Sequence, residues 1–274
     1  MLKKLSNSLY MWQITKIKRG WMFGCYLDSY ILYFMHPHLL SIRKRDVSMN
    51  AKEKWNQEYK KLNAIPSSTR TSPAHGLVKV KELCVIDEES KTILDLGCGN
   101  GRNAIYLANL GFDVECIDFS SEALSLFEKK LKDIDASRIG VTKANVSSGL
   151  PYDDNSFDCV LDSYFHCHFT NLDEWNSILV DIGRLLKKGG KLVSIQLSID
   201  DEYYKNKIAN EFDGGFVSYD DTNGFKKIHF SERRYSELLK SHGFSVSSFH
   251  VDFEDFVSGR SYLRQVVIFC AEKQ

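Results

Sequence analysis

Short apolar runs alternate with amphipathic stretches along residues 92–197. Each apolar run is bounded by glycine or polar residues, which is typical of strands. Each amphipathic stretch places apolar side chains at helical spacing, and Gly111 ends the first of them as a C-terminal cap. Strands that alternate with helices predict a parallel sheet with helices on both faces. We expect strands at 92–96, 113–117, 140–143, 157–161 and 191–197, and helices at 102–110, 121–132 and 173–186.

The pattern changes near the C-terminus. A helix over 231–241 ends at Gly243, and two apolar stretches, 244–251 and 264–271, follow with no helix between them. Strands joined without a crossover helix pair antiparallel. The expected fold class is therefore α/β, with a doubly wound, mostly parallel sheet of seven strands that ends in a C-terminal antiparallel strand pair.

Residues 1–50 differ in composition from the rest of the chain. They hold eight basic and two acidic residues and all five methionines, whereas the whole chain balances 36 basic against 36 acidic residues. We therefore predict a basic, aromatic N-terminal extension over 1–50 and a second domain over 51–274. Three interpretations of the extension stay open: an arm that touches a membrane surface or the main domain, an organelle-targeting presequence, or a misplaced start upstream of Met49.

The apolar stretch 21–35 does not predict a membrane span. It contains Asp28, and its length of about 15 residues falls short of the roughly 20 that a spanning helix needs. No transmembrane segment is expected. A cytoplasmic protein is expected, although targeting to an organelle or a membrane surface by residues 1–50 stays open.

The composition narrows the class of protein. Four prolines and 17 glycines in 274 residues are typical of neither collagen-like nor disordered chains. A formal net charge of zero argues against a protein that holds nucleic acid by a basic field. Seven cysteines without a C-x-x-C pair favour free thiols in a reducing compartment. The composition gives no indication of the oligomeric state.

A glycine-rich turn joins the first expected strand to the first expected helix, and reads Leu94-Asp95-Leu96-Gly97-Cys98-Gly99-Asn100-Gly101. Glycines let bare backbone N–H groups approach a ligand at a helix N-terminus. A dinucleotide-binding fingerprint would read G-x-G-x-x-G, but Arg102 stands where its third glycine would be. Asp95 ends the strand, and a carboxylate there would repel a pyrophosphate and suits a cationic or amino-bearing ligand.

A second carboxylate, Asp118, ends the next expected strand, 17 residues after Gly101. At that position a carboxylate can accept hydrogen bonds from both hydroxyls of a ribose. A ribose together with a sulfonium and an amino-acid tail describes S-adenosylmethionine. The two carboxylates and the glycine turn therefore predict a site for this cofactor.

Residues 92–198 resemble the class I S-adenosylmethionine-dependent methyltransferases. The 95–101 stretch matches their D-x-G-x-G-x-G loop, Asp118 matches their ribose-binding acid, and Ala144-Asn145-Val146 resembles their adenine-contact turn, which more often carries Asp at the position of Asn145. The stretches 150–158 and 185–192 resemble two later motifs of the family. The resemblance implies a Rossmann-like sheet and a cofactor-binding set of Asp95, Gly97, Cys98, Gly99, Gly101, Asp118, Phe119, Asn145, Val146 and Asp162.

The stretch LDLGCGNGRNAIYLA and the helix before it are similar to small-molecule methyltransferases of the tellurite-resistance and thiopurine type. That helix is opened by the N-cap pattern of residues 50–53. It carries Trp55 and Tyr59 at i and i+4 on one face. The two rings either pack the helix onto the sheet or close over the cofactor.

The loop after the fourth expected strand supplies the catalytic candidates. His166 and His168 are placed where a general base could act, with Tyr164 as a positioning group. Asp162 either faces the methionine amino group or the substrate, or caps the next helix. No metal site is expected at 166–168, because neighbouring side chains point apart and no partner cluster has zinc-like spacing.

The expected methyl acceptor is a small molecule, and no nucleic acid partner is expected. Methylation of nucleic-acid amino groups would be indicated by a D/N-P-P-Y/F loop after the fourth expected strand. Residues 162–165 read Asp-Ser-Tyr-Phe and lack its prolines. The aromatic insert 200–227 is either a lid over an apolar pocket or ordinary packing. A non-catalytic S-adenosylmethionine-binding regulator and an RNA methyltransferase that uses the basic extension stay open. A nicotinamide-dependent oxidoreductase is disfavoured by the glycine spacing and Asp95.

Overall fold

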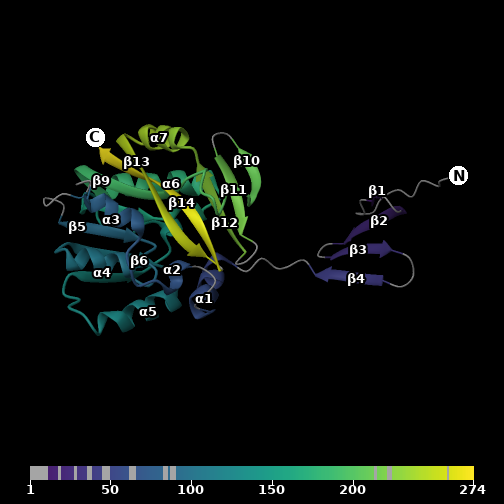
Figure 1. Cartoon of the computed structure of the whole chain (residues 1–274), viewed down its shortest axis with the longest axis horizontal. Coiled ribbons are helices and arrows are strands. Elements are labelled where there is room, and N and C mark those ends of the chain that lie inside the picture. The colour runs from purple at the N-terminus through teal and green to yellow at the C-terminus, as the bar shows by residue number, and fades with distance from the viewer. Residues whose placement is uncertain are drawn as a thin grey trace. The chain divides into compact units, whose positions relative to one another are not determined.

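The computed structural model describes residues 12–17, 20–27, 30–35, 39–44, 50–61, 66–82, 86, 91–212, 215–220, 224–257 and 259–274. The chain divides into two compact units, Met1–Ala51 and Lys52–Gln274 (Figure 1). Among the described residues, no helix combines the length and apolar character needed to cross a membrane.

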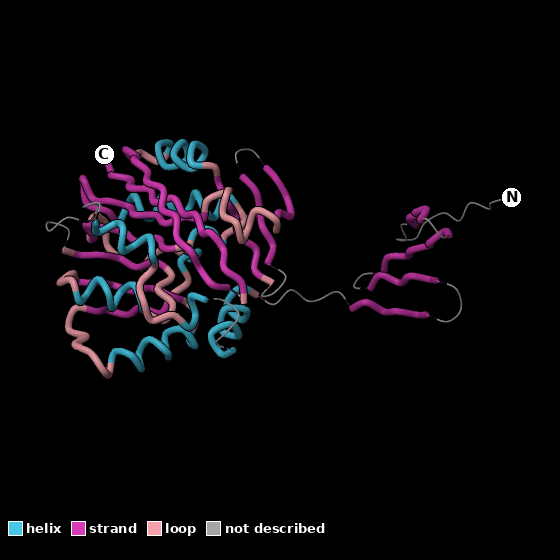
Figure 2. Tube along the Cα trace, viewed as in Figure 1, coloured by secondary structure: helices cyan, strands magenta, loops and turns pink. Residues whose placement is uncertain are grey.

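The first unit contains a four-stranded antiparallel sheet, in the order β1-β2-β3-β4 (Figure 2). Aromatic and β-branched residues, which favour strands, are frequent in these segments. The charge and composition of residues 1–50 had given no prediction of strands in this segment. The strands are β1 (Trp12–Ile17), β2 (Gly20–Leu27), β3 (Tyr30–Met35) and β4 (Leu39–Lys44).

The second unit is built on a seven-stranded sheet, in the order β13-β14-β9-β8-β5-β6-β7. The five strands from β9 to β7 are parallel, and β14 pairs antiparallel with both β9 and β13. This arrangement confirms the predicted fold class. The strands are β5 (Thr92–Leu96), β6 (Asp113–Asp118), β7 (Ile139–Lys143), β8 (Phe157–Ser163), β9 (Leu186–Leu197), β13 (Phe244–Val257) and β14 (Arg260–Lys273).

Helices cover both faces of this sheet. One apolar cluster joins β5 and β9 to α3, α4 and α5, and a second joins the opposite sides of these strands to α6 and α7. Side chains of the central strands β5 and β8 are buried on both faces, as expected where helices cover both faces of a parallel sheet. The helices are α1 (Ala51–Lys61), α2 (Pro66–Thr69), α3 (His75–Glu82), α4 (Arg102–Asn109), α5 (Ser121–Leu131), α6 (Leu172–Leu185) and α7 (Glu232–Ser241).

Three of the predicted strands were too short by several residues. β9 begins at Leu186 rather than at residue 191, so Gly189 and Gly190 lie inside the strand. β13 and β14 extend to Val257 and back to Arg260, and the positive φ of Gly259 closes the hairpin. The polar residues between 252 and 263 hid this extension in the sequence.

The aromatic insert forms a third sheet, which is compatible with either a lid or ordinary packing. Its strands are β10 (Ile208–Phe212), β11 (Gly215–Asp220) and β12 (Phe225–Phe230), paired antiparallel. β12 packs against a 3₁₀ turn, η2 (His166–His168), that follows β8. The insert therefore contacts the loop that carries the catalytic candidates.

Candidate functional site

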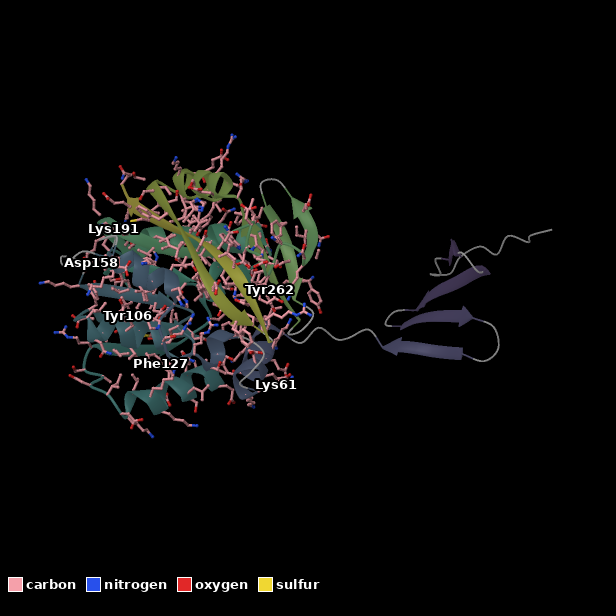
Figure 3. All side chains as sticks on the ribbon, in the orientation of Figure 1. Lys61, Tyr106, Phe127, Asp158, Lys191 and Tyr262 are labelled. Carbon is pink, nitrogen blue, oxygen red and sulfur yellow. The ribbon has the colours of Figure 1, made fainter. Side chains whose placement is uncertain are left out.

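The glycine turn between β5 and α4 depends on glycine at three positions. Gly97, Gly99 and Gly101 have φ values of +62°, +58° and +76°, in the left-handed region that other residues avoid. A Cβ atom at Gly97 would collide with the ring of Phe165, one at Gly99 with the hydroxyl of Tyr59, and one at Gly101 with the ring of Phe127 (Phe127 is labelled in Figure 3). The turn is therefore held against three aromatic side chains.

Asp95 brings a buried carboxylate to this turn. Its side chain is 1% exposed, and its Oδ2 atom has no hydrogen-bond partner among the described residues. Burial raises the pKa of Asp95 to about 7, although the nearby charge of Arg102 opposes the rise. A buried acceptor without a partner is costly in free energy, so this atom is the feature that most strongly indicates a missing cationic or amino-bearing ligand.

Asp118 fastens the end of β6 to the glycine turn. Its Oδ2 accepts the backbone N–H of Gly99 at 3.0 Å, and its Oδ1 accepts that of Ser120 at 2.8 Å. Burial raises the pKa of Asp118, and these hydrogen bonds only partly offset the rise. Cys98 is buried in the turn, and its N–H donates to the carbonyl of Ile117. Phe119 is half-buried directly after Asp118.

The predicted adenine-contact turn lies at the end of β7. Asn145 is exposed, and its Oδ1 accepts the backbone N–H of Ser147 at 3.2 Å, which caps the short 3₁₀ turn η1 (Val146–Ser148). Val146 is buried in the core. Because β7 is parallel to β6 and β5, this turn lies at the same sheet edge as Asp95 and Asp118.

Asp162 is the centre of a buried polar network. Its Oδ1 accepts the backbone N–H groups of Phe165 and His166, and its Oδ2 accepts from His166 Nδ1 (3.0 Å), Ser194 Oγ (2.7 Å) and Gln196 Nε2 (2.7 Å). Burial alone would raise the pKa of Asp162, but the His166 charge and these hydrogen bonds lower it on balance. Five donors fill the capacity of a carboxylate. This geometry favours the capping alternative for Asp162.

The three catalytic candidates have different surroundings. His166 is fully buried against Trp175, with ring centroids 4.7 Å apart, and its Nε2 has no partner among the described residues. His168 meets Trp55 edge-on at 4.7 Å. Burial, together with nearby positive groups, lowers the pKa of His168 well below its ordinary value, so its imidazole is neutral at physiological pH.

Tyr164 follows β8 directly and lies two residues before η2. It has a positive φ of 59°, which is uncommon for a residue with a side chain. Burial raises the pKa of Tyr164 to about 12, while the charges of Arg102 and Arg264 oppose the rise. Its hydroxyl is therefore protonated and suited to donate a hydrogen bond.

Helix α1 covers the site with aromatic rings. Tyr59 is buried with its hydroxyl against Gly99, and Trp55 packs on Phe225 of β12 with centroids 4.5 Å apart. Asn56 of the same helix accepts a hydrogen bond from Ser120 at the start of α5. This placement favours a role for α1 in closing over the cofactor.

Sequence reasoning missed two basic residues. Arg102 begins α4 beside Asp95, and Lys227 is 8% exposed in β12. The signal for Arg102 was its place directly after the glycine turn. The signal for Lys227 was its alternation with Phe225 and His229, which puts a lysine on an otherwise uncharged strand face.

The residues at this sheet edge fit S-adenosylmethionine. They supply a carboxylate oxygen without a partner, a positive-φ glycine turn at a helix N-terminus and a second carboxylate at the end of the next strand. Within the described part of the chain, no group of three histidine, cysteine or acidic residues could hold a metal ion.

Comparison with known proteins agrees with this geometry. Residues 94–194 match the family model described as "Methyltransferase domain". The ubiquinone/menaquinone biosynthesis C-methyltransferase UbiE of Wigglesworthia glossinidia brevipalpis is 30% identical over 183 residues, which are 61% of this chain and 71% of that protein. The demethylmenaquinone methyltransferase of Renibacterium salmoninarum is 34% identical over 106 residues, or 39% of this chain and 41% of that protein.

A solved structure of an S-adenosylmethionine-dependent methyltransferase from Methanosarcina mazei superimposes with a TM-score of 0.57 and 25% identity. The match covers 68% of this chain and 93% of that one. The chain spans only about two fifths to three fifths of the length of the demethylmenaquinone methyltransferases that it matches from Renibacterium salmoninarum and Bacillus subtilis.

Proposed function

We propose that this chain, which belongs to the S-adenosylmethionine-dependent methyltransferase family, transfers a methyl group from S-adenosylmethionine to a small-molecule acceptor. The observation that carries the proposal is the buried Asp95 carboxylate, whose Oδ2 has no partner among the described residues beside a glycine turn. We assign the catalytic domain to residues 51–274, the N-terminal extension to residues 1–50 and the protein to the cytoplasm.

The cofactor roles follow from position. Asp95 would neutralise the positive charge of the cofactor, and the glycine turn at 97–101 would hold its methionine part. Asp118 would accept hydrogen bonds from the ribose hydroxyls, and Phe119, Asn145 and Val146 would border the adenine. Asp162 acts on the site indirectly, because its hydrogen bonds hold the loop of Phe165 and His166 in place.

Positioning and exclusion of water account for the chemistry. The cofactor supplies an electrophilic methyl group and leaves as a neutral thioether, so little acid assistance is needed. Trp55 and Tyr59 keep water from the sheet edge. Tyr164 donates a hydrogen bond to the methyl acceptor. The neutral His168 accepts a hydrogen bond from the methyl acceptor and takes a proton from it where the acceptor has one to lose.

The acceptor class is a small metabolite. Relatives named as quinone-biosynthesis methyltransferases favour such an acceptor, and so does the tellurite-resistance and thiopurine likeness of the glycine-turn segment. A non-catalytic regulator that binds S-adenosylmethionine is the second candidate, favoured by the dense aromatic packing over the glycine turn.

The test is methyl transfer to a metabolite pool. We expect purified protein to move labelled methyl from S-adenosylmethionine into at least one small molecule and to release S-adenosylhomocysteine. Cofactor binding without release of that product would support the regulator instead. Transfer into RNA, lost on deletion of residues 1–50, would identify an RNA methyltransferase.

His168→Ala is expected to lower turnover roughly 100-fold or more with little loss of stability, because a positioned proton acceptor contributes about 10²–10⁴-fold. Turnover with the identified acceptor and thermal unfolding are the measurements. His166→Ala is the comparison: it breaks the bond to Asp162 inside the core, so it should lower the unfolding temperature first. Unchanged turnover in both variants would remove histidine from the reaction.

A further inference from the structure

Lys227 is a buried cation on a strand face that also carries two aromatic or imidazole rings. Phe225, Lys227 and His229 alternate along β12, so their side chains share one face, and all three are less than a tenth exposed. This face packs against η2. Burial of a lysine normally requires a nearby carboxylate.

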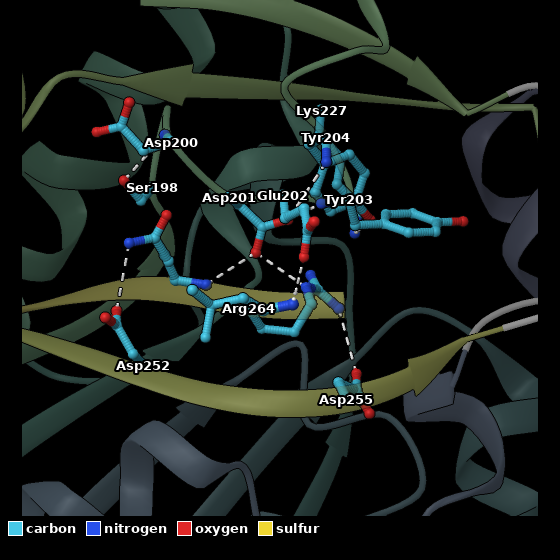
Figure 4. A network of polar contacts seen from close by, with 12 residues as sticks. Ser198, Asp200, Asp201, Glu202, Tyr203, Tyr204, Lys227, Asp252, Asp255 and Arg264 are labelled. Atoms are coloured by element: carbon cyan, nitrogen blue, oxygen red, sulfur yellow. Dashed lines mark hydrogen bonds and ion pairs between the residues drawn. The ribbon is translucent and has the colours of Figure 1, made fainter. Parts of the chain in front are cut away.

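No carboxylate pairs with Lys227 among the described residues. Its Nζ donates to the hydroxyl of Tyr204 at 2.7 Å and lies 4.8 Å from the centre of that ring (Figure 4). Burial lowers the pKa of Lys227, but Tyr204 and the Cys167 thiol raise it on balance, while Arg264 opposes the rise. None of these groups is a carboxylate.

The acidic residues close by are already engaged. Asp201 and Asp255 both pair with Arg264 (Figure 4). Arg70 also pairs with Asp255. These two carboxylates balance two guanidinium groups and leave the ammonium of Lys227 as the excess charge. The hydrogen-bonding capacity of Asp162 is filled by its own donors.

Neutral groups with free hydrogen-bonding atoms surround the ammonium. His168 and His229 each have a buried Nδ1 without a partner in the described structure. Burial, then the Lys227 charge, lowers the pKa of both, that of His229 to about 3. At the rim, the Lys54 ammonium lies 4.5 Å from the Phe225 ring centre and adds a second positive charge.

This face adjoins the proposed cofactor site. Trp55 contacts both His168 and Phe225, and Tyr59, one turn further along α1, reaches Gly99. The charges of Arg102 and Lys227 both oppose the rise in the pKa of Tyr164, so this residue is near charges of both regions. A planar acceptor that contacts these rings would therefore have its anionic end near Lys227 and its other end toward the glycine turn.

We propose that the methyl acceptor is a planar organic anion, with a carboxylate, phenolate or enolate oxygen that pairs with Lys227 beside the rings of Trp55, Phe225 and Tyr204. The proposal rests on the methyltransferase activity proposed above. The anion supplies the missing counter-charge, and His168 and His229 supply hydrogen-bonding atoms beside it.

The first experiment identifies the charge of the acceptor. A small-molecule extract is divided by strong anion exchange at pH 10 into retained and unretained compounds, and each fraction is incubated with full-length protein and methyl-labelled S-adenosylmethionine. We expect label in the retained fraction alone. Label confined to unretained compounds would overturn the inference and leave the proposed methyl transfer intact.

The second experiment tests Lys227 on the labelled acceptor. Lys227→Met is expected to raise KM by at least about 10-fold while kcat changes less, and Lys227→Arg to recover part of the loss. Lys226→Met, which removes the exposed neighbouring ammonium, is the matched control and should leave KM unchanged. A purely structural lysine would give the opposite result, with a lower unfolding temperature for Lys227→Met and an unchanged KM.

A third measurement does not depend on turnover. Thermal unfolding is followed with S-adenosylhomocysteine present and with benzoate, 4-nitrophenolate or neutral benzamide added. We expect the two anions, but not benzamide, to raise the unfolding temperature of wild type and to leave that of Lys227→Met unchanged. Equal shifts in both proteins, or no shift in wild type, would overturn the inference. Absence of label in every fraction would instead count against the proposed function.

Discussion

Asp95→Asn is expected to weaken binding of S-adenosylmethionine roughly 10- to 100-fold at pH 8, because a charge-assisted hydrogen bond contributes about 1.5–3 kcal/mol. The same variant should be at least as stable as wild type without the cofactor, since it removes a buried carboxylate that has no partner on Oδ2 in the described structure. Calorimetry with the cofactor and thermal unfolding without it measure the two effects. Weaker cofactor binding, together with an unfolding temperature no lower than that of wild type, would identify Asp95 as a ligand-binding rather than a structural residue.

The pH dependence follows from the pKa of about 7 at Asp95. The folded state holds this proton more tightly than the unfolded state, so the stabilisation from this group is complete below about pH 4 and is lost as pH rises through 7. Cofactor affinity changes in the other direction: it rises as Asp95 ionises between about pH 6 and 8. In Asp95→Asn, this pH dependence should be absent from both the stability and the cofactor affinity.

Asp113→Asn is the control for this prediction. Asp113 begins β6, and its exposed carboxylate pairs with Arg138 at the surface. Its replacement should change neither cofactor affinity nor its pH dependence, because exposed ion pairs contribute little. Wild-type affinity in Asp95→Asn at pH 8 would contradict the role given to Asp95.

The sheet and the glycine turn were predictable because each depends on local sequence. The alternation of apolar strands with helices predicted that the strands are parallel. The spacing of Gly97, Gly99 and Gly101 predicted a tight turn, and all three residues have positive φ values. Asp95 and Asp118 follow from the same logic, since residues at the carboxyl ends of adjacent parallel strands meet at one edge.

The acceptor side was not predictable, because it depends on contacts between distant segments. The surroundings of Lys227 come from Tyr204, η2 and the first residues of β14, and the alternation of residues in FKKIHF does not by itself show that this lysine is buried without a carboxylate partner in the described structure. The role of Asp162 was open for a similar reason: Ser194 and Gln196, which fill its hydrogen-bonding capacity, lie on the neighbouring strand β9.

The role of glycine at position 101 can be separated into two physical parts. Gly101→Ala is expected to lower the free energy of unfolding by about 2–5 kcal/mol. A positive φ costs an alanine about 1–2 kcal/mol, and overpacking costs about 1–3 kcal/mol, since the new methyl group meets the fully buried ring of Phe127. Chemical denaturation measures the change.

Gly111→Ala isolates the first part. Gly111 has a φ of +96°, but nothing lies within 4 Å of the position that its Cβ would take. Its replacement should therefore cost only about 1–2 kcal/mol. The collision at residue 101 should also be relieved by Phe127→Leu, so that Gly101→Ala loses less stability in that background than in wild type. Equal losses for Gly101→Ala and Gly111→Ala would mean that backbone conformation alone, and not packing against α5, requires glycine at the start of α4.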